Sequence, residues 1–233
     1  MEINSSSLKN TARIAGLLYL LLVITGIYGI MYIPSQIIVE GDTVATANNI
    51  LSNEFLFRTG FLNDIISNTI FLFLVLVLYR LFKQVNENQA KLMFALVIVQ
   101  IPVLFMMEAF NITSLMILKG EILKTFELSQ RQDLAMLFLK INDYGTLPLE
   151  MFWGLWLLPF GLLVYKSEFI PRIFGILLVI AGIAYMIDST ISLLFPSYSV
   201  FVNKPTLLLV AIGEISITLW LLIKGVKTQE RKI

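Results

Sequence analysis

The chain has 233 residues, of which 58% are hydrophobic and 14% are charged, and its formal net charge is +1. Soluble domains are nearer about half apolar and a quarter charged, so this composition indicates a membrane protein, and so small a net charge argues against a nucleic-acid partner. The sequence contains no cysteine and no histidine. Their absence excludes disulfides, Cys/His metal centres, haem ligation through histidine, thiol nucleophiles and His-dependent triads, and we expect no cofactor.

Six apolar stretches are long enough to cross the hydrocarbon core of a bilayer, which takes about 20 residues of helix. They predict an all-α fold: a single domain over residues 1–233 that forms a polytopic bundle of six transmembrane helices. The first stretch is too long for the apolar part of a signal peptide, so we interpret it as an uncleaved anchor. The predicted spans are about 14–33, 59–81, 92–118, 148–165, 171–195 and 205–223.

Lysine and arginine are unevenly divided among the segments that join these spans. The turn after the second span contains Arg80 and Lys91, and the turn after the fourth contains Lys166 and Arg172. The long loop after the first span has only Arg58. Basic residues are concentrated on the cytoplasmic side of membrane proteins, so this contrast predicts that both termini are cytoplasmic.

Two short amphipathic helices are predicted in the outer loops. Asp42 can cap the first, and its apolar residues, such as Val44 and Ala47, share one face. Ser129 and Gln132 form a capping box for the second. Asp143-Tyr-Gly145 and Pro148 are then expected to break the chain before the fourth span. These helices either simply cover the bundle or gate access to a substrate.

Five acidic residues fall inside the predicted spans, where each costs about 2.5–3.5 kcal/mol at the centre of a helix. Such residues normally face the interior of a bundle and mark a functional site. Given the direction of each span, all five are expected to lie in one layer between the midplane and the outer surface. They are Asp64, Glu108, Glu150, Asp188 and Glu214.

Polar neighbours extend this layer. Asn68 shares a helical face with Asp64, and Asn111 shares one with Glu108. Arg58, at the outer end of the second span, is the expected cationic partner. We therefore predict an outward-opening, carboxylate-lined pocket within the membrane, and its ligand-binding residues are Arg58, Asp64, Asn68, Glu108, Asn111, Glu150, Asp188 and Glu214.

Glycines predict where two of the helices approach each other. Gly154 and Gly161 lie on the fourth span, and Gly175 and Gly182 lie on the fifth. Small residues allow the backbones of membrane helices to come close together. We therefore expect the fourth and fifth spans to pack tightly.

Crowded carboxylates in a membrane are either protonated or neutralised by a bound cation. The first hypothesis is thus a protein that binds or transports a cation, an amine-bearing solute or a lipid-like ligand. The second is an enzyme that acts on a lipid or isoprenoid with carboxylates as acid and base, which the lack of histidine and cysteine disfavours. The third is a non-catalytic sensory or accessory subunit in which the acids are protonated struts between helices. Few polar residues lie in the inner halves of the spans, which favours outward-facing binding or lipid handling over alternating access.

Short segments spread along the chain resemble those of a known family. They are TARIAGLLY at 11–19, FRTGFLND at 57–64, PRIFGILL at 171–178, AGIAYMIDS at 181–189, GE at 213–214 and LWLLIKG at 219–225. In this order they resemble the bacterial membrane family catalogued as "domain of unknown function 4386", over about residues 9–226. The resemblance implies a multi-pass protein of the bacterial plasma (inner) membrane and implies no activity. Arg58, Asp64, Asp188 and Glu214 lie in these segments, whereas Glu150 does not.

Overall fold

The computed structural model describes residues 5–227, and these form helices joined by short turns, with no strand among them. Six helical stretches are long and apolar enough to cross a membrane, which confirms the predicted all-α class and the number of spans. The termini lie outside the described residues, and their cytoplasmic location stays a prediction. The six stretches are Ser7–Ile37, Glu54–Phe82, Glu87–Leu118, Leu128–Lys166, Arg172–Leu194 and Pro196–Ile223.

Shorter elements extend the first and last stretches. The first helix continues through a π-helix, η1, and the last one is preceded by a 3-10 turn, η2. The bounds in chain order are α1 (Ser5–Gly26), η1 (Ile27–Tyr32), α2 (Ile33–Ile37), α3 (Thr43–Ser52), α4 (Glu54–Phe82), α5 (Glu87–Ile98), α6 (Ile101–Leu118), α7 (Leu128–Lys166), α8 (Arg172–Leu194), η2 (Pro196–Tyr198) and α9 (Ser199–Ile223).

The described chain divides into two compact units. Unit 1 takes in the chain up to Leu22, the segment Ile70–Gln100 and the chain from Leu147 onwards. Unit 2 consists of Val23–Thr69 and Ile101–Thr146. The helices α1, α4 and α7 therefore contribute residues to both units.

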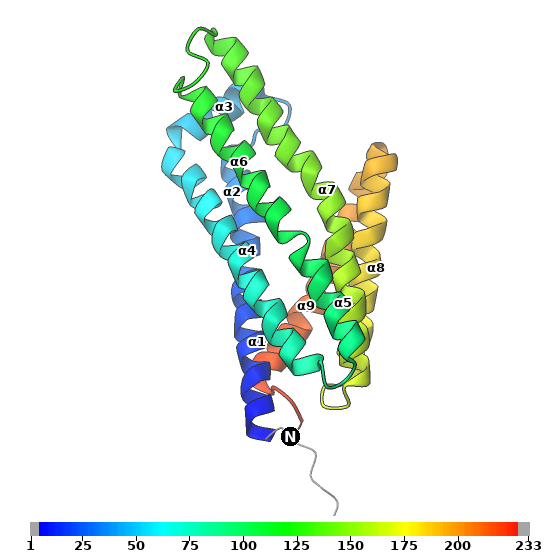
Figure 1. Cartoon of the computed structure of the whole chain (residues 1–233). Coiled ribbons are helices and arrows are strands. Elements are labelled where there is room, and N and C mark those ends of the chain that lie inside the picture. The colour runs from blue at the N-terminus through cyan, green and yellow to red at the C-terminus, as the bar shows by residue number, and fades with distance from the viewer. Residues whose placement is uncertain (1–4, 228–233) are drawn as a thin grey trace, which may run out of the picture. The chain divides into compact units, whose positions relative to one another are not determined.

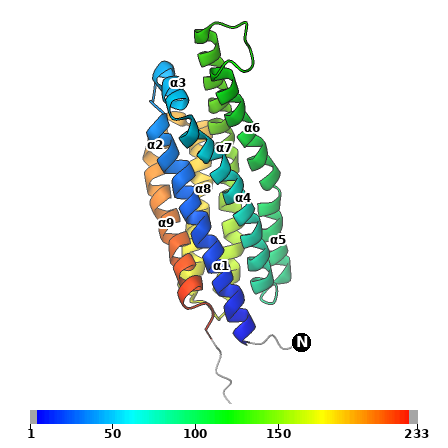
Figure 2. The ribbon, with the colours of Figure 1, turned by 90° about the vertical axis from the view of Figure 1, so that its left-hand side faces the viewer.

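In unit 1, α8 packs against both α7 and α9. The helices α8 and α9 lie side by side (Figure 1 and Figure 2). A Cβ atom added at Gly154 would lie 2.5 Å from the carbonyl oxygen of Gly182, and one added at Gly161 would lie 2.7 Å from that of Gly175. The backbones of α7 and α8 are thus in direct contact at two levels, which confirms the predicted close packing of the fourth and fifth spans.

An aromatic cluster fills the interior of unit 1 and fixes α1 against α7. Trp156 stacks on Phe160 with ring centroids 5.4 Å apart, and Phe71 meets Trp156 edge to face at 5.3 Å. Tyr19 of α1 lies 6.2 Å from Trp156 and is fully buried. Rings of this size supply most of the packing area in such a core, so they hold the Tyr19 hydroxyl in a defined place.

Unit 2 has its own apolar core, to which the short helix α3 contributes. The Asp42 carboxylate accepts a hydrogen bond from the backbone N–H of Ala45 at 2.8 Å, which confirms the predicted cap. Ala47 and Ile50 of α3 are fully buried, whereas Val44 is exposed, so the face predicted to carry Val44 and Ala47 is buried only in part. The buried residues of this core are Ile33, Ile37, Ala47, Ile50, Phe57, Phe61, Leu115, Ile117, Leu118 and Ala135.

The predicted break before the fourth span is wrong, because α7 runs without interruption through Asp143-Tyr-Gly145 and Pro148. Gly145 is helical and makes no turn, and the end of the Met107 side chain packs against it. Proline is tolerated inside membrane helices where side chains satisfy the backbone nearby. One such side chain is that of Ser189, which donates to the carbonyl oxygen of Leu147 at 2.7 Å.

The start of α7 also differs from the prediction. The Ser129–Gln132 capping box does not form, because the helix begins at Leu128. The cap forms two residues earlier instead: the backbone N–H of Glu127 donates to the Gln130 side-chain oxygen at 3.0 Å. The spacing of a capping box is kept, since Gln130 lies three residues after Glu127.

The third predicted span is interrupted near its middle. The helix α5 ends at Ile98 and α6 begins at Ile101, just before Pro102. Proline has no N–H to donate to the preceding turn, which favours a break at this point. The amide of the buried Gln100 donates to the carbonyl oxygen of Leu96 at 2.9 Å and so satisfies part of the interrupted backbone.

Candidate functional site

In unit 1, the carboxylate of Glu214 is held by a tyrosine from the other end of the chain. The Tyr19 hydroxyl of α1 donates a hydrogen bond to Glu214 Oε2 of α9 at 2.7 Å. The close approach of the two helices makes this bond possible, because a Cβ atom at Gly16 would collide with the backbone of Leu222. A neutral phenol thus donates a hydrogen bond to a carboxylate that lies well inside a membrane-spanning helix.

Asp188 of α8 is also surrounded by neutral donors. Its side chain is 7% exposed and accepts a hydrogen bond from the Ser192 hydroxyl at 3.2 Å. The side-chain amide of Asn203 is oriented so that its nitrogen faces the neighbouring oxygen atoms, and this nitrogen donates to Asp188 Oδ1 at 3.0 Å. The Asp188 carboxylate therefore accepts hydrogen bonds from one hydroxyl and one amide, both of them uncharged.

Tyr185 relates the three acids that the sequence predicts inside the spans of unit 1. Its side chain lies within electrostatic range of Glu214, Glu150 and Asp188. The indole of Trp153 meets the Tyr185 ring edge to face, with centroids 5.9 Å apart. Within residues 5–227, however, no three acidic side chains come close enough together to hold a metal ion. The group thus combines carboxyl side chains with aromatic rings, and it has no metal-chelating arrangement within the described residues.

In unit 2, Asp64 of α4 faces the π-helix η1. The Asn63 amide donates to Asp64 Oδ1 at 3.0 Å and to the carbonyl oxygen of Thr25 at 3.0 Å. A Cβ atom at Gly29 would lie 2.6 Å from Asp64 Oδ1, so a side chain at this position would have to displace the Asp64 carboxylate. π-helical segments are rare and are often found at functional sites. Asn63 therefore links the Asp64 carboxylate to the last turn of α1, directly before the π-helix η1.

Glu108 of α6 is the second acid of unit 2. It is 8% exposed and accepts a hydrogen bond from the Asn111 amide at 3.2 Å. Asp64 lies within its electrostatic range. Asn68 is half-buried on α4, one turn beyond Asp64. The structure therefore brings Asp64 and Glu108 near each other, and it gives Glu108 the asparagine partner that the sequence predicts.

Arg58 is ion-paired with an acid at the protein surface. Its Nε donates to Glu54 Oε1 at 2.8 Å, and both side chains are substantially exposed. Glu54 also pairs with Lys119 at 3.0 Å, and Lys119 pairs with Glu121 at 3.0 Å. The hydrogen bonds from Lys119 to Glu121 and Glu54 raise the pKa of the lysine. Arg58 thus belongs to a surface ion-pair network and does not neutralise Asp64.

Replacing Arg58 by Gln is expected to lower the free energy of unfolding by less than about 1 kcal/mol, because exposed ion pairs contribute little. The thermal unfolding midpoint of the purified protein in detergent measures this change. A loss of several kcal/mol would contradict the surface role and would point to a second contact of the guanidinium with a buried acid.

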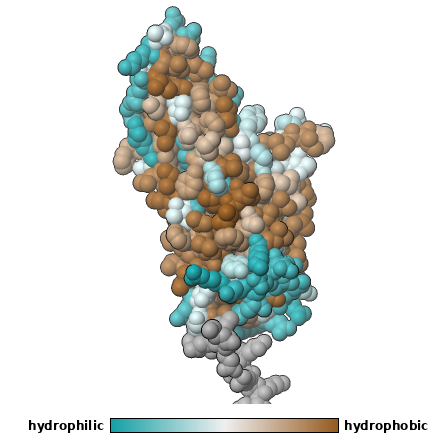
Figure 3. Space-filling model, in the orientation of Figure 1, coloured by the Kyte–Doolittle hydropathy of each residue, from teal (hydrophilic) through white to brown (hydrophobic). Residues whose placement is uncertain are grey.

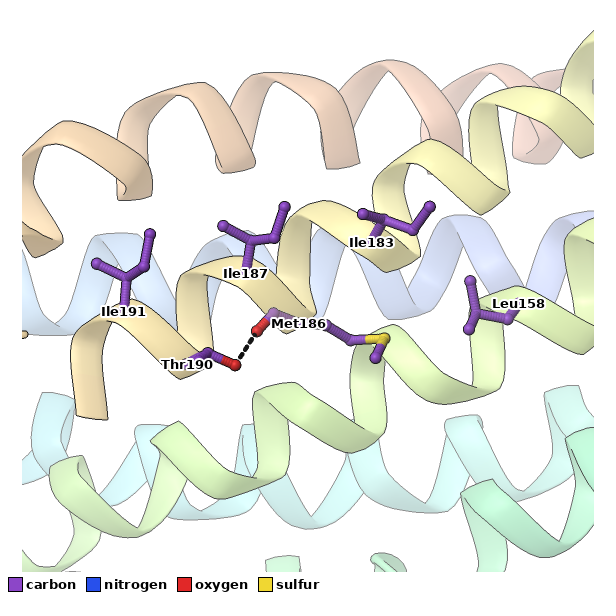
Figure 4. A pocket seen from close by; sticks show the side chains of 6 residues that line it. All are labelled: Leu158, Ile183, Met186, Ile187, Thr190 and Ile191. Atoms are coloured by element: carbon purple, nitrogen blue, oxygen red, sulfur yellow. Dashed lines mark hydrogen bonds between the residues drawn. The ribbon is translucent and has the colours of Figure 1, made fainter. Parts of the chain in front are cut away.

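An open groove lies on unit 1 between α7 and α8, and Figure 4 shows its lining side chains. Its volume is about 500 Å³. The one polar side chain drawn there, Thr190, donates its hydroxyl proton to the carbonyl oxygen of Met186 at 2.7 Å. None of the predicted ligand-binding residues lines this groove, so the carboxylate-lined pocket stays a prediction. The lining residues are Leu158, Ile183, Met186, Ile187, Thr190 and Ile191.

Sequence reasoning predicted Asn111 as the partner of Glu108, but it missed Tyr19 as the partner of Glu214 and Asn63 as the partner of Asp64. Tyr19 and Asn63 both lie in the family-like segments quoted above, and this was the available signal for them. Asn203 carries no such signal. Its contact with Asp188 depends on how the end of α8 meets the start of α9.

Six membrane-spanning helices with acids inside them define an integral, multi-pass α-helical membrane protein. The chain belongs to the family described as "Domain of unknown function (DUF4386)", whose model matches residues 14–225. An uncharacterized protein of Archaeoglobus fulgidus is 37% identical over 93 residues, which are 40% of this chain and 51% of the relative. The match thus spans about half the length of that relative. No solved structure gives a significant match.

Proposed function

We propose that this protein binds a cation, and in particular an amine-bearing solute, at the carboxylates that surround Tyr185 in unit 1. One observation carries the proposal. Asp188 and Glu214 accept hydrogen bonds from neutral side chains, and within residues 5–227 neither of them is ion-paired. Asp64 and Glu108 in unit 2 meet the same condition and form a second candidate pair.

An ionised carboxylate inside a membrane bundle is costly unless a positive charge compensates it. A hydroxyl or an amide supplies a hydrogen bond but no compensating charge. Such a group is stable either as the neutral acid or with a bound cation. A cationic ligand would therefore exchange with protons at Asp188 and Glu214.

The surroundings of Tyr185 favour an ammonium group over a metal ion. No set of three acids is available to chelate a metal within the described residues. The faces of Trp153 and Tyr185 attract ammonium groups through their ring quadrupoles. An alkyl part of the ligand would find an apolar surface in the groove between α7 and α8 (Figure 4), which supports a lipid-like amine as one form of the ligand.

We place this site in the plasma membrane, with its opening on the outer side and the basic turns on the cytoplasmic side. The support is the distribution of lysine and arginine, since Arg80 lies in the last turn of α4, Lys166 ends α7 and Arg172 begins α8, all at one end of the spans. Binding at an outward-opening site is compatible with either a receptor-like or a carrier function.

Titration calorimetry on the protein in lipid nanodiscs tests this function. We expect n-hexylammonium to bind at least tenfold more tightly than hexanol, because the two differ chiefly in charge. Equal binding of the two probes would show that the acids do not recognise charge. No binding of any amine, with the fold intact, would favour protonated struts between helices.

A further inference from the structure

One end of unit 1 gathers basic residues from segments far apart in the sequence. The start of α1 meets the end of α9, where Arg13 Nη2 donates to the carbonyl oxygen of Ile223 at 3.5 Å. Gly225 just beyond α9 has φ +70°, and a Cβ atom there would lie 3.1 Å from Lys9 Cγ. Lys9 and Arg13 are thus placed beside Lys224.

The turn between α7 and α8 joins the same end. The backbone N–H of Lys227 donates to the carbonyl oxygen of Phe169 at 2.9 Å. In that turn, the Arg172 guanidinium lies 5.4 Å from the centre of the Tyr165 ring. Phe169 stacks on Phe82 with centroids 5.9 Å apart, which adds the turn between α4 and α5. The turn between α7 and α8, the turn between α4 and α5 and the segment after α9 therefore share one surface with the start of α1 and the end of α9.

We name this surface the basic end. Figure 3 shows hydrophilic side chains gathered at the lower end of unit 1, next to an apolar surface. Within residues 5–227 no acidic side chain is ion-paired with any member of the basic end, and its nearest acid in sequence is the exposed Glu168. The members of the basic end are Lys9, Arg13, Lys166, Arg172, Lys224 and Lys227.

The turn between α4 and α5 adds positive charge to this surface. Arg80 and Lys83 are exposed there. Lys91 is balanced by Glu87, with which it pairs at 3.0 Å. The pairing of Lys91 with Glu87 therefore leaves an excess of positive charge on this surface.

We propose that the basic end binds the phosphodiester headgroup of an anionic phospholipid. Each helix that ends there is a membrane span, so the basic side chains lie where the headgroups of one leaflet lie. Uncompensated lysines and arginines attract anionic headgroups, and the guanidinium groups of Arg13 and Arg172 form bidentate contacts with phosphate. The acyl chains hold such a ligand beside the spans, which gives it an advantage over a soluble phosphate.

Native mass spectrometry of the detergent-solubilised full chain, with phosphatidylglycerol or phosphatidylcholine added, tests this proposal. We expect the unmodified protein to bind phosphatidylglycerol at least tenfold more tightly. The double variant K224Q/K227Q is expected to lose about tenfold or more of that affinity, since each basic side chain near an anionic headgroup contributes about fivefold. K204Q, at the opposite end of α9, is the matched control and is expected to bind as the unmodified protein does.

Three results would overturn the proposal: equal affinity for the two lipids, an unchanged affinity in K224Q/K227Q, or an equal loss in K204Q. Glycerol phosphate added at the same concentration is expected not to compete, and full competition would identify a site for soluble phosphate. If K224Q/K227Q fails to fold, K166Q/R172Q tests the other half of the basic end by the same measurement.

Discussion

Replacing Glu214 by Gln is expected to weaken the binding of n-hexylammonium by roughly ten- to a hundredfold, while the free energy of unfolding stays the same or rises. Glutamine keeps the shape of the side chain, and its amide oxygen can still accept the hydrogen bond of the Tyr19 hydroxyl. What is lost is the negative charge, and hydrogen bonds to charged groups contribute about 1.5–3 kcal/mol. Calorimetry and thermal unfolding in the same nanodiscs measure the two quantities.

Glu87→Gln is the matched control for this substitution. It is the same chemical change in unit 1, at an exposed residue that is ion-paired with Lys91. We expect it to leave amine binding unchanged. Tyr19→Phe removes the hydrogen bond and keeps the carboxylate, so its effect on binding is expected to be smaller than that of Glu214→Gln. If Glu214→Gln is more stable and binds the amine normally, the proposal of a charged ligand is wrong.

Asp64→Asn distinguishes the two candidate pairs of acids. Asp64 belongs to unit 2, where it is near Glu108 and is hydrogen-bonded to Asn63. If the ligand binds around Tyr185, this variant should keep its amine affinity and its fold. If Asp64→Asn loses amine affinity and Glu214→Gln keeps it, the binding site lies in unit 2, and the recognition of the ammonium group by a carboxylate is unchanged.

The spans and some local contacts follow from the sequence because they depend on neighbouring residues. The length and apolarity of a stretch decide whether it can cross a bilayer, so all six spans are predicted. The cap at Asp42 depends on one side chain and the N–H of Ala45. The contact of Gly154 with Gly182 follows from the lack of side chains at both residues.

Other features depend on contacts between distant parts of the chain, and local patterns do not show them. Gly145 has the sequence signature of a turn, but it lies inside α7, where the end of the Met107 side chain packs against it. Glu214 meets Tyr19 only because of how α1 and α9 are rotated against each other. The sequence therefore predicts which acids lie in the spans and that Asn111 is a neighbour of Glu108, but it does not predict the bonds from Tyr19 to Glu214 and from Asn63 to Asp64.

The contact between α7 and α8 provides the largest expected effect on stability. Gly154→Val is expected to lower the free energy of unfolding by about 3 kcal/mol or more. Its Cβ atom would lie 2.5 Å from the carbonyl oxygen of Gly182 and 3.2 Å from the backbone nitrogen of Met186. Both neighbours are backbone atoms of a membrane-spanning helix, so no side chain can move aside and the two helices must separate.

The thermal unfolding midpoint in detergent measures this loss, and Gly26→Val is the matched control. Gly26 is helical as well, but a Cβ atom there would have no neighbour within 4 Å, so the same substitution should have little effect. Gly154→Ala is expected to fall between the two, because alanine adds the colliding atom without the branches of valine and favours the helix by about 1 kcal/mol over glycine. Equal midpoints for Gly154→Val and Gly26→Val would mean that α7 and α8 do not touch at this level.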